Sequence, residues 1–254
     1  TKGKKIVMPA TILECPSMKI LSARFYKNGI VSREIMAENL DKELKKNIKM
    51  PKKKQEKIES VNIGGFDDVR VVCYSQVKKT GIKKAPDMSE IGLSGTPEEK
   101  FNFVKENFGK EISISNVFKI GGLVDFRGLT KGHGFSGPVK RFGITLKSHK
   151  SEKGVRRPGS LGPWHPARVT FRAPMAGQLG MFTRVSYNNA IIHVGKPEGK
   201  KEFENIEHYG NIKTEYILVR GSIQGPAKRQ LIATLPLRET KKQVKKKLEF
   251  IELR

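Results

Sequence analysis

Apolar and polar residues alternate in the first part of the chain, a pattern that predicts β-strands. Within residues 6–26, the apolar Leu21, Ala23 and Phe25 occupy every second position, so we expect one face of a strand to be buried. Two prolines and an Asn-Gly pair at 28–29 interrupt the pattern, as turns do. Residues 6–26 are therefore expected to form strands.

The apolar spacing changes in residues 32–48. Met36, Leu40, Leu44 and Ile48 recur at every fourth position, with charged residues between them. This spacing places the four side chains on one side of a helix, so it predicts an amphipathic helix over these residues.

A second helix is predicted to begin at Thr96. Thr96 supplies an N-cap hydroxyl, Pro97 suits the first helical position, and Glu99 completes a capping box. The apolar run at 69–77 predicts another strand. Residues 30–115 are therefore expected to form an α/β insert.

Regular periodicity is lost over residues 127–184, which are rich in glycine and proline. An irregular segment of this length is usually functional or disordered. The pattern as a whole predicts a mainly β body of residues 1–29, 116–130 and 185–254, interrupted by the insert and by a long irregular arm at 131–184. Strands are predicted at 117–130, in a hairpin over 184–195 that turns at Asn188-Asn189, and at 215–223, 229–237 and 246–253.

The net charge identifies the class of partner. The chain has 254 residues, with 50 Lys and Arg against 25 Asp and Glu, a formal net charge of +25. A surplus of this size repels itself unless a polyanion neutralises it, so nucleic acid is the expected partner and an anionic membrane surface the second choice. No apolar run is long enough to span a bilayer, and the basic region lacks the pattern of a membrane-binding helix. We therefore expect no membrane partner.

The arm, residues 131–184, combines basic and aromatic residues. Glu152 is its only acidic residue, and four aromatic residues, Phe135, Phe142, Trp164 and Phe171, lie among its cations. Cations can pair with phosphates and aromatic rings can stack on bases, so ordered contact with RNA is favoured over a solvated face or a disordered tail. The residues that we expect to contact RNA are Lys131, Gly132, His133, Gly134, Phe135, Lys140, Arg141, Lys147, Lys150, Arg156, Arg157, Trp164, His165, Arg168, Arg172 and Arg184.

Trp164 is the only tryptophan, and it admits two interpretations. A tryptophan is often a core anchor, but Trp164 lies between Pro163 and the pair His165-Pro166 with no helix or strand pattern around it. We therefore favour a stiff loop tip that presents the ring over a buried position.

The stretch KGHGFSG at 131–137 matches G-x-G-x-x-G, the dinucleotide-binding fingerprint. That site needs a helix that begins at the third glycine and an acid about 20 residues later. Residues 138–143 look too short and too interrupted by glycine for such a helix, and Glu152 is alone and wrongly spaced. A nucleotide-dependent or RNA-modifying enzyme that uses the 132–137 loop is the alternative function, and a DNA-binding chromatin protein is a third.

Other enzyme chemistry is also not expected. Cys15 and Cys73 are isolated, which excludes a cysteine-based zinc site and suggests two small buried residues in a reducing compartment. The histidines lack metal-ligand spacing, and no nucleophile elbow G-x-S-x-G is present. We predict no catalytic residue, no metal, no cofactor and no small-molecule substrate.

Several separated motifs resemble the large-subunit ribosomal protein L-three family, in its archaeal and eukaryotic branch. They cover most of the chain and occur in the family's order: ATILECPSMKI, GLTKGHGFSGPVKRFG, RRPGSLGPWHPARV, AGQLGMFTRVSYNNAIIHVG and YILVRGSIQGPAKRQLI.

The resemblance implies a closed β-barrel that carries the α/β insert and the arm. It implies a structural, cytoplasmic constituent of the large ribosomal subunit, whose partners are large-subunit ribosomal RNA and neighbouring ribosomal proteins. Residues 131–141 would form the arm's root, and Arg156, Arg157 and Trp164 would reach toward the peptidyl transferase centre. Gln178 matches the family's Gly-Gln position and joins the expected RNA contacts. The family's N-terminal segment is expected to be missing from this sequence, which starts at Thr1.

Overall fold

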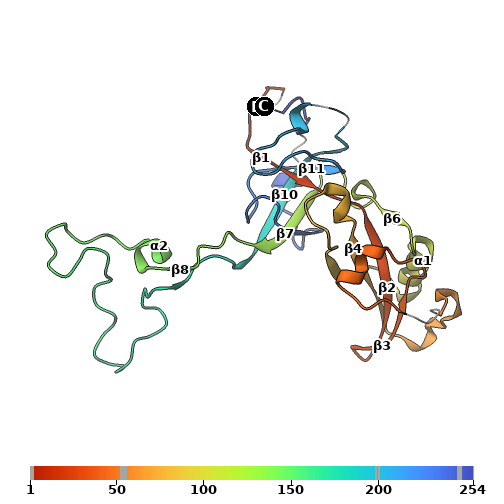
Figure 1. Cartoon of the computed structure of the whole chain (residues 1–254), viewed down its shortest axis with the longest axis horizontal. Coiled ribbons are helices and arrows are strands. Elements are labelled where there is room, and N and C mark those ends of the chain that lie inside the picture. The colour runs from red at the N-terminus through yellow and green to blue at the C-terminus, as the bar shows by residue number, and fades with distance from the viewer. Residues whose placement is uncertain (1–2, 52–55, 198, 200, 245–247, 254) are drawn as a thin grey trace. The chain divides into compact units, whose positions relative to one another are not determined.

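The computed structural model describes residues 3–51, 56–197, 199, 201–244 and 248–253. It is mainly β, as predicted (Figure 1). The chain divides into two compact units. The first unit contains residues 1–123, 189–222 and 239–254, and the second contains residues 124–188 and 223–238. Short 3-10 helices lie at Lys42–Lys46, Ile58–Ser60, Ile63–Gly65, Val77–Thr80, Ile114–Asn116 and Lys201–Phe203.

One sheet of the first unit lies in the predicted insert and the strands next to it. Its strands are β2 (Met18–Lys27), β3 (Ile30–Met36), β4 (Asp68–Ser75) and β5 (Met88–Gly92), in the order β3-β2-β4-β5. The two-residue β6 (Glu111–Ile112) also pairs with β2. This sheet confirms the strands expected within 6–26 and 69–77.

The helix α1 (Pro97–Asn107) begins as predicted. The Thr96 side chain accepts a hydrogen bond from the Glu99 backbone, and the Glu99 side chain accepts one from the Thr96 backbone. Phe101 and Val104 on its inner face are 1% and 0% exposed, and they pack into the core with Phe25 of β2. The local cap and the apolar stripe together fix this helix against the sheet.

The helix predicted over 32–48 is wrong. Residues Ile30–Met36 form β3, which pairs with β2 across a turn in which Asn28 and Gly29 have φ values of 52° and 74°. A short 3-10 helix follows at Lys42–Lys46, where Leu44 is fully buried. The four apolar residues spaced by four do pack in one cluster, but a strand and a bend bring them there.

A bulge in β2 changes which face each side chain meets. The pairing of β2 with β4 shifts between Ile20 and Ser22. Leu21 therefore packs in a cluster with Leu44, while Ala23 and Phe25 pack in the cluster on the other face. The three residues are buried as expected, but they do not share one face.

Three more strands pair in the first unit, in the order β1-β11-β10. They are β1 (Ala10–Glu14), β11 (Tyr216–Arg220) and the C-terminal part of β10 (Thr183–Gly195). The expected hairpin over 184–195 is wrong, because β10 is one strand of 13 residues. Asn188 does adopt a positive φ of 54°, but the strand continues past it.

In the second unit the order is β10-β7-β12, with β7 (Leu123–Leu129) and β12 (Ile232–Thr234). The described strands form open sheets, so the closed barrel is not confirmed. A short helix α3 (Lys241–Val244) follows, and residues 248–253 contain no strand. The strand predicted at 246–253 is therefore wrong at these positions, while residues 246–247 lie outside the described residues.

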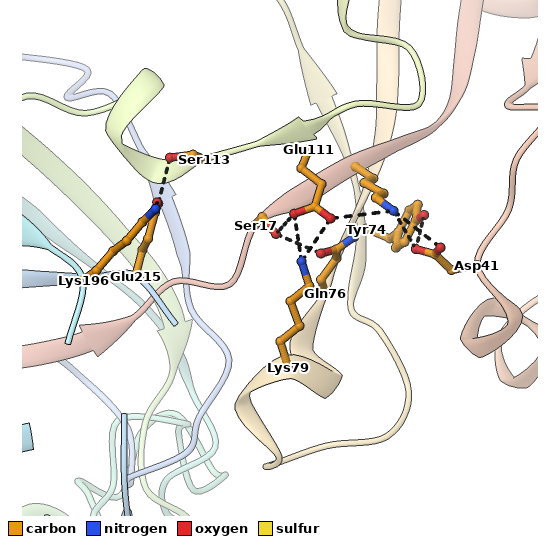
Figure 2. A network of polar contacts seen from close by, with 10 residues as sticks. Ser17, Asp41, Tyr74, Gln76, Lys79, Glu111, Ser113, Lys196 and Glu215 are labelled. Atoms are coloured by element: carbon orange, nitrogen blue, oxygen red, sulfur yellow. Dashed lines mark hydrogen bonds and ion pairs between the residues drawn. The ribbon is translucent and has the colours of Figure 1, made fainter. Parts of the chain in front are cut away.

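A polar network holds together loops of the first unit (Figure 2). Glu111 accepts hydrogen bonds from Ser17 at 2.9 Å and from Lys79 at 2.8 and 3.0 Å. The Lys79 ammonium is the main reason why the pKa of Glu111 is lowered to about 2, and the Ser17 hydroxyl adds to it. Nearby, the Glu215 carboxylate accepts from the Ser113 hydroxyl at 2.8 Å. These contacts fix the segment around β6 against its neighbours.

Candidate nucleic-acid interface

Two segments of the second unit form the root of the arm, residues 130–136 and 177–182. Their strands β8 (Phe135–Ser136) and β9 (Gly177–Gln178) pair in antiparallel fashion. The His133 N–H donates to the Leu179 carbonyl and the Leu179 N–H donates to the Gly134 carbonyl, both at 2.9 Å. The pairing therefore gives the arm an ordered base, beyond which Figure 1 shows long irregular loops.

Glycine is required where the two root segments approach most closely. Gly180 has a φ of +80°, and a Cβ there would lie 1.9 Å from the carbonyl oxygen of Lys131. Gly132, on the facing segment, would place a Cβ 3.1 Å from the Met181 side chain. Gly180, and to a lesser degree Gly132, is therefore needed because two segments of the protein itself lie close together there.

A short helix does follow the third glycine of KGHGFSG, contrary to the prediction. α2 (Pro138–Phe142) begins after Gly137 with a proline in its first turn, and it ends at Gly143, whose φ is 68°. Its five residues are too few for the helix of a dinucleotide site, and no acid lies near it in the sequence. The missing acid and the short helix still weigh against a nucleotide cofactor.

Arg141 of α2 has a structural role that the sequence did not reveal. Its Nε donates to the Gln178 carbonyl at 3.1 Å, and its Nη1 donates to the Met175 carbonyl at 2.9 Å. Arg141 is the only one of the predicted RNA contacts that is half-buried; the structure leaves all the others exposed. The guanidinium therefore joins α2 to the returning segment of the arm.

Gln224 is a second residue that the sequence analysis missed. Its Nε2 donates to the Phe126 carbonyl of β7 at 2.9 Å and to the Arg184 carbonyl of β10 at 3.0 Å. These bonds hold the two strands from which the root emerges. A lone glutamine in a loop carries no sequence signal for this role.

The cations of the arm are not neutralised by the protein. In the described residues every ion pair of a Lys or Arg lies in the first unit, for example Arg24 with Glu90 at 2.7 Å and Lys100 with Asp68 at 2.6 Å. The described Lys and Arg of the arm form none. The exposed cations without an ion pair are Lys131, Lys140, Lys147, Lys150, Lys153, Arg156, Arg157, Arg168, Arg172 and Arg184.

Large aromatic rings are exposed among these cations. Trp164 is 87% exposed and Phe171 is 94% exposed, so the buried interpretation of Trp164 is excluded. Phe135 and Phe142 are also exposed. Proteins bind single-stranded nucleic acid with this combination: exposed rings stack on bases, and cations that lack ion pairs contact phosphates.

The other candidate chemistries gain nothing from the structure. The described residues contain no group of three or more His, Cys, Asp or Glu placed to hold a metal ion. Burial raises the pKa of the Cys15 thiol to about 12 and that of Cys73 to about 11, so neither is an activated nucleophile. The described part of the chain has no helix long and apolar enough to cross a membrane.

Comparisons with known proteins agree with the resemblance noted in the sequence. The model of a family described as Ribosomal protein L3 matches residues 1–254. The chain is similar to large ribosomal subunit protein uL3 of Archaeoglobus fulgidus, with 41% identity over 245 residues, or 90% of this chain and 72% of the relative. It is also similar to the protein of that name from Methanocaldococcus jannaschii, with 39% identity over 254 residues, or 93% of this chain and 74% of the relative.

Proposed function

The chain belongs to the ribosomal protein L3 family, and we propose that it is a structural constituent of the large ribosomal subunit that binds large-subunit ribosomal RNA through its arm. The relatives named above are archaeal large-subunit proteins, which supports the assignment to the archaeal branch. The chain acts as a scaffold for the RNA and performs no chemistry.

The observation that carries this proposal is the contrast between the two units. All the ion pairs that Lys and Arg form in the described residues lie in the first unit. The arm presents cations without acidic partners on an irregular backbone. An isolated protein gains nothing from this arrangement. When the cations meet phosphates, condensed counterions are released, and binding becomes favourable and dependent on salt.

The proposed mechanism divides the work among residue types. Exposed cations such as Lys147, Lys150 and Arg156 neutralise closely spaced phosphates. Trp164 and Phe171 stack on unpaired bases or wedge between them. Prolines and the hydrogen-bonded root limit the conformational entropy that the arm loses when it becomes ordered on RNA.

Membership of the family extends the proposal to the domains, the reach of the arm and the protein partners. The body of residues 1–29, 116–130 and 185–254 holds a position on the particle as a closed barrel, the insert is residues 30–115, and the arm is residues 131–184. The arm reaches toward the peptidyl transferase centre, where it stabilises the RNA, and the protein supports subunit assembly. Neighbouring large-subunit proteins are its other partners.

Sedimentation tests the proposal. The tagged protein, expressed in an archaeal host, is expected to co-migrate with large subunits on a sucrose gradient after a high-salt wash. Purified protein is expected to prefer folded large-subunit ribosomal RNA over duplex DNA of equal length at moderate salt. Equal affinity for both would favour a general DNA-binding protein, and a calorimetric signal with NAD or FAD would favour the enzyme alternative.

A further inference from the structure

An apolar hollow of about 350 Å³ lies within the arm, between three segments that are distant in the sequence. Pro138 at the start of α2 forms one wall, Pro158 and Leu161 form the second, and Pro174 and Met175 form the third. This volume is near the lower end of the range for small-molecule pockets, about 300–1,000 Å³. It suits one flat group rather than a large ligand.

Arg141 fixes two of the three walls. Its guanidinium donates to the Met175 carbonyl at 2.9 Å and to the Gln178 carbonyl at 3.1 Å, which holds α2 beside the segment that contains Pro174 and Met175. The hollow is therefore attached to the hydrogen-bonded root of the arm. Leu161 and Met175 nevertheless remain 37% and 44% exposed, so their apolar atoms lack a cover.

The surroundings of the hollow indicate the charge of its occupant. Arg157 lines it, Arg156 precedes Arg157 in the sequence, and Lys140 follows the lining Pro138 by two residues. The described structure gives these three cations no acidic partner, and Glu152 is the only acid in the whole arm. A group with an apolar face and an attached negative charge matches both properties.

We propose that this hollow receives one unstacked nucleobase of the ribosomal RNA, with Arg157 contacting the phosphate of the same nucleotide or of the next one. Apolar side chains such as Pro, Leu and Met pack against base faces, and specific RNA recognition commonly uses bases that are splayed out of a helix. This inference rests on the proposed function and adds a defined base-binding site to it.

The test blocks the hollow and probes the RNA. Gly159 lines the hollow, and a Cβ at this position meets no atom within 4 Å, so Gly159→Phe places a ring there without a clash at the backbone. Val169→Phe is the control in the same arm, because Val169 is 54% exposed and does not line the hollow. Each full-length protein is bound to full-length large-subunit ribosomal RNA, and unpaired bases are probed with base-specific reagents.

The wild-type protein is expected to protect at least one unpaired base. Gly159→Phe should restore the reactivity of that base and weaken binding about tenfold, the order of the loss of one stacked base. Val169→Phe should retain the protection. Circular dichroism of both variants checks that each is folded.

A second pair of variants tests the phosphate contact at equal charge. Arg157→Gln should weaken protection of the same base, whereas Arg156→Gln should lower affinity without exposing it. If no base changes its reactivity with Gly159→Phe, the hollow does not bind a base; cross-linking of the hollow to a neighbouring protein in assembled subunits would also overturn the proposal. Failure of the wild-type protein to prefer ribosomal RNA over duplex DNA would instead reject the proposed function itself.

Discussion

Some residues of the arm are exposed and available to contact RNA, whereas others stabilise the fold of the arm itself. Trp164 has no part in a core, because 87% of it is exposed. By contrast, Gly180 allows the two root segments to approach closely, and Arg141 bonds α2 to the segment that contains Gln178. Basic or glycine-rich sequence alone does not distinguish these roles, since both kinds of residue occur in the same stretch.

Truncation of the tryptophan is predicted to affect binding without affecting folding. Trp164→Ala should leave the melting temperature of the free protein nearly unchanged, while its affinity for large-subunit ribosomal RNA should fall about tenfold through lost stacking. Phe101→Ala is the opposite control, because its ring is 1% exposed and its loss should cost about 3–5 kcal/mol of unfolding free energy. Thermal melts and filter binding measure the two effects. A large drop in melting temperature for Trp164→Ala would show that the ring is part of a core.

The close approach at Gly180 predicts a strong steric effect. Gly180→Ala should open the root, because its Cβ would lie 1.9 Å from the Lys131 carbonyl oxygen. Gly134→Ala is the control, since Gly134 also has a positive φ but open space around it, so only a backbone cost of about 1–2 kcal/mol applies. Hydrogen exchange at the His133 and Leu179 amides should be faster in Gly180→Ala than in the control. Equal exchange in the two variants would contradict the close approach.

The hydrogen bonds that the Glu111 carboxylate accepts predict that the stability of the protein depends on pH. The pKa of Glu111 is lowered from an ordinary value of 4.5 to about 2, so its contribution to stability is present above pH 4.5 and is lost as the pH falls through about 2. Because the side chain is 44% exposed, Glu111→Gln should cost only about 1 kcal/mol or less at pH 7.

Urea unfolding at pH 7, 4 and 2.5 measures this effect. The difference in unfolding free energy between wild type and Glu111→Gln should become smaller as the pH falls. The control is Glu106→Gln, which removes an exposed carboxylate on α1 and should show no such change. A constant gap would mean that Lys79 and Ser17 do not hold the ionised form.

At the scale of elements, α2 depends on one side chain. Arg141→Gln should speed hydrogen exchange at the Leu179 amide and loosen α2, because two hydrogen bonds to carbonyls are lost. Lys140→Gln removes the same charge from the neighbouring position, which has no such bonds, so it should lower RNA affinity without changing the exchange. Identical behaviour of the two variants would indicate that Arg141 acts only through its charge.

The elements that the sequence predicted correctly are those with local signals. The capping box at Thr96 and Glu99, the alternation in β2 and the apolar run in β4 depend on neighbours in the chain, so they could be recognised. The spacing from Met36 to Ile48 misled, because a strand and a bend can bring residues spaced by four to one cluster. Asn188 misled in another way, since a positive φ can occur inside a continuous strand.

The candidate interface was predictable in its charge but not in its construction. Two features pointed to exposed contacts directly: a basic sequence with Glu152 as its single acid, and Trp164 placed between Pro163 and His165-Pro166. The partners of Arg141 lie 34 and 37 residues away along the chain, and the hollow is assembled from three separate segments. Such arrangements depend on the folded arm, which periodicity and composition do not describe.

At the scale of the whole molecule, charge is divided between parts with different roles. The first unit combines a buried core with cations of which some form ion pairs, such as Arg24 with Glu90 and Lys100 with Asp68. The arm has the opposite composition, and under the proposed function RNA phosphates neutralise its cations. Of the chain's net charge of +25, the arm carries +10, from 11 Lys and Arg against the single acid Glu152.

The salt dependence of binding to large-subunit ribosomal RNA measures how many cations of the arm contact phosphates. An arm variant with Lys147, Lys150, Arg156 and Arg157 changed to Gln is compared with an insert variant in which the exposed Lys42, Lys45, Lys46 and Lys49 are changed to Gln. Both lose four charges. The slope of log affinity against log salt should become shallower by about 3 in the arm variant, and it should change little in the insert variant. Equal slopes for the wild type and the arm variant would contradict the claim that the arm's free cations bind the RNA.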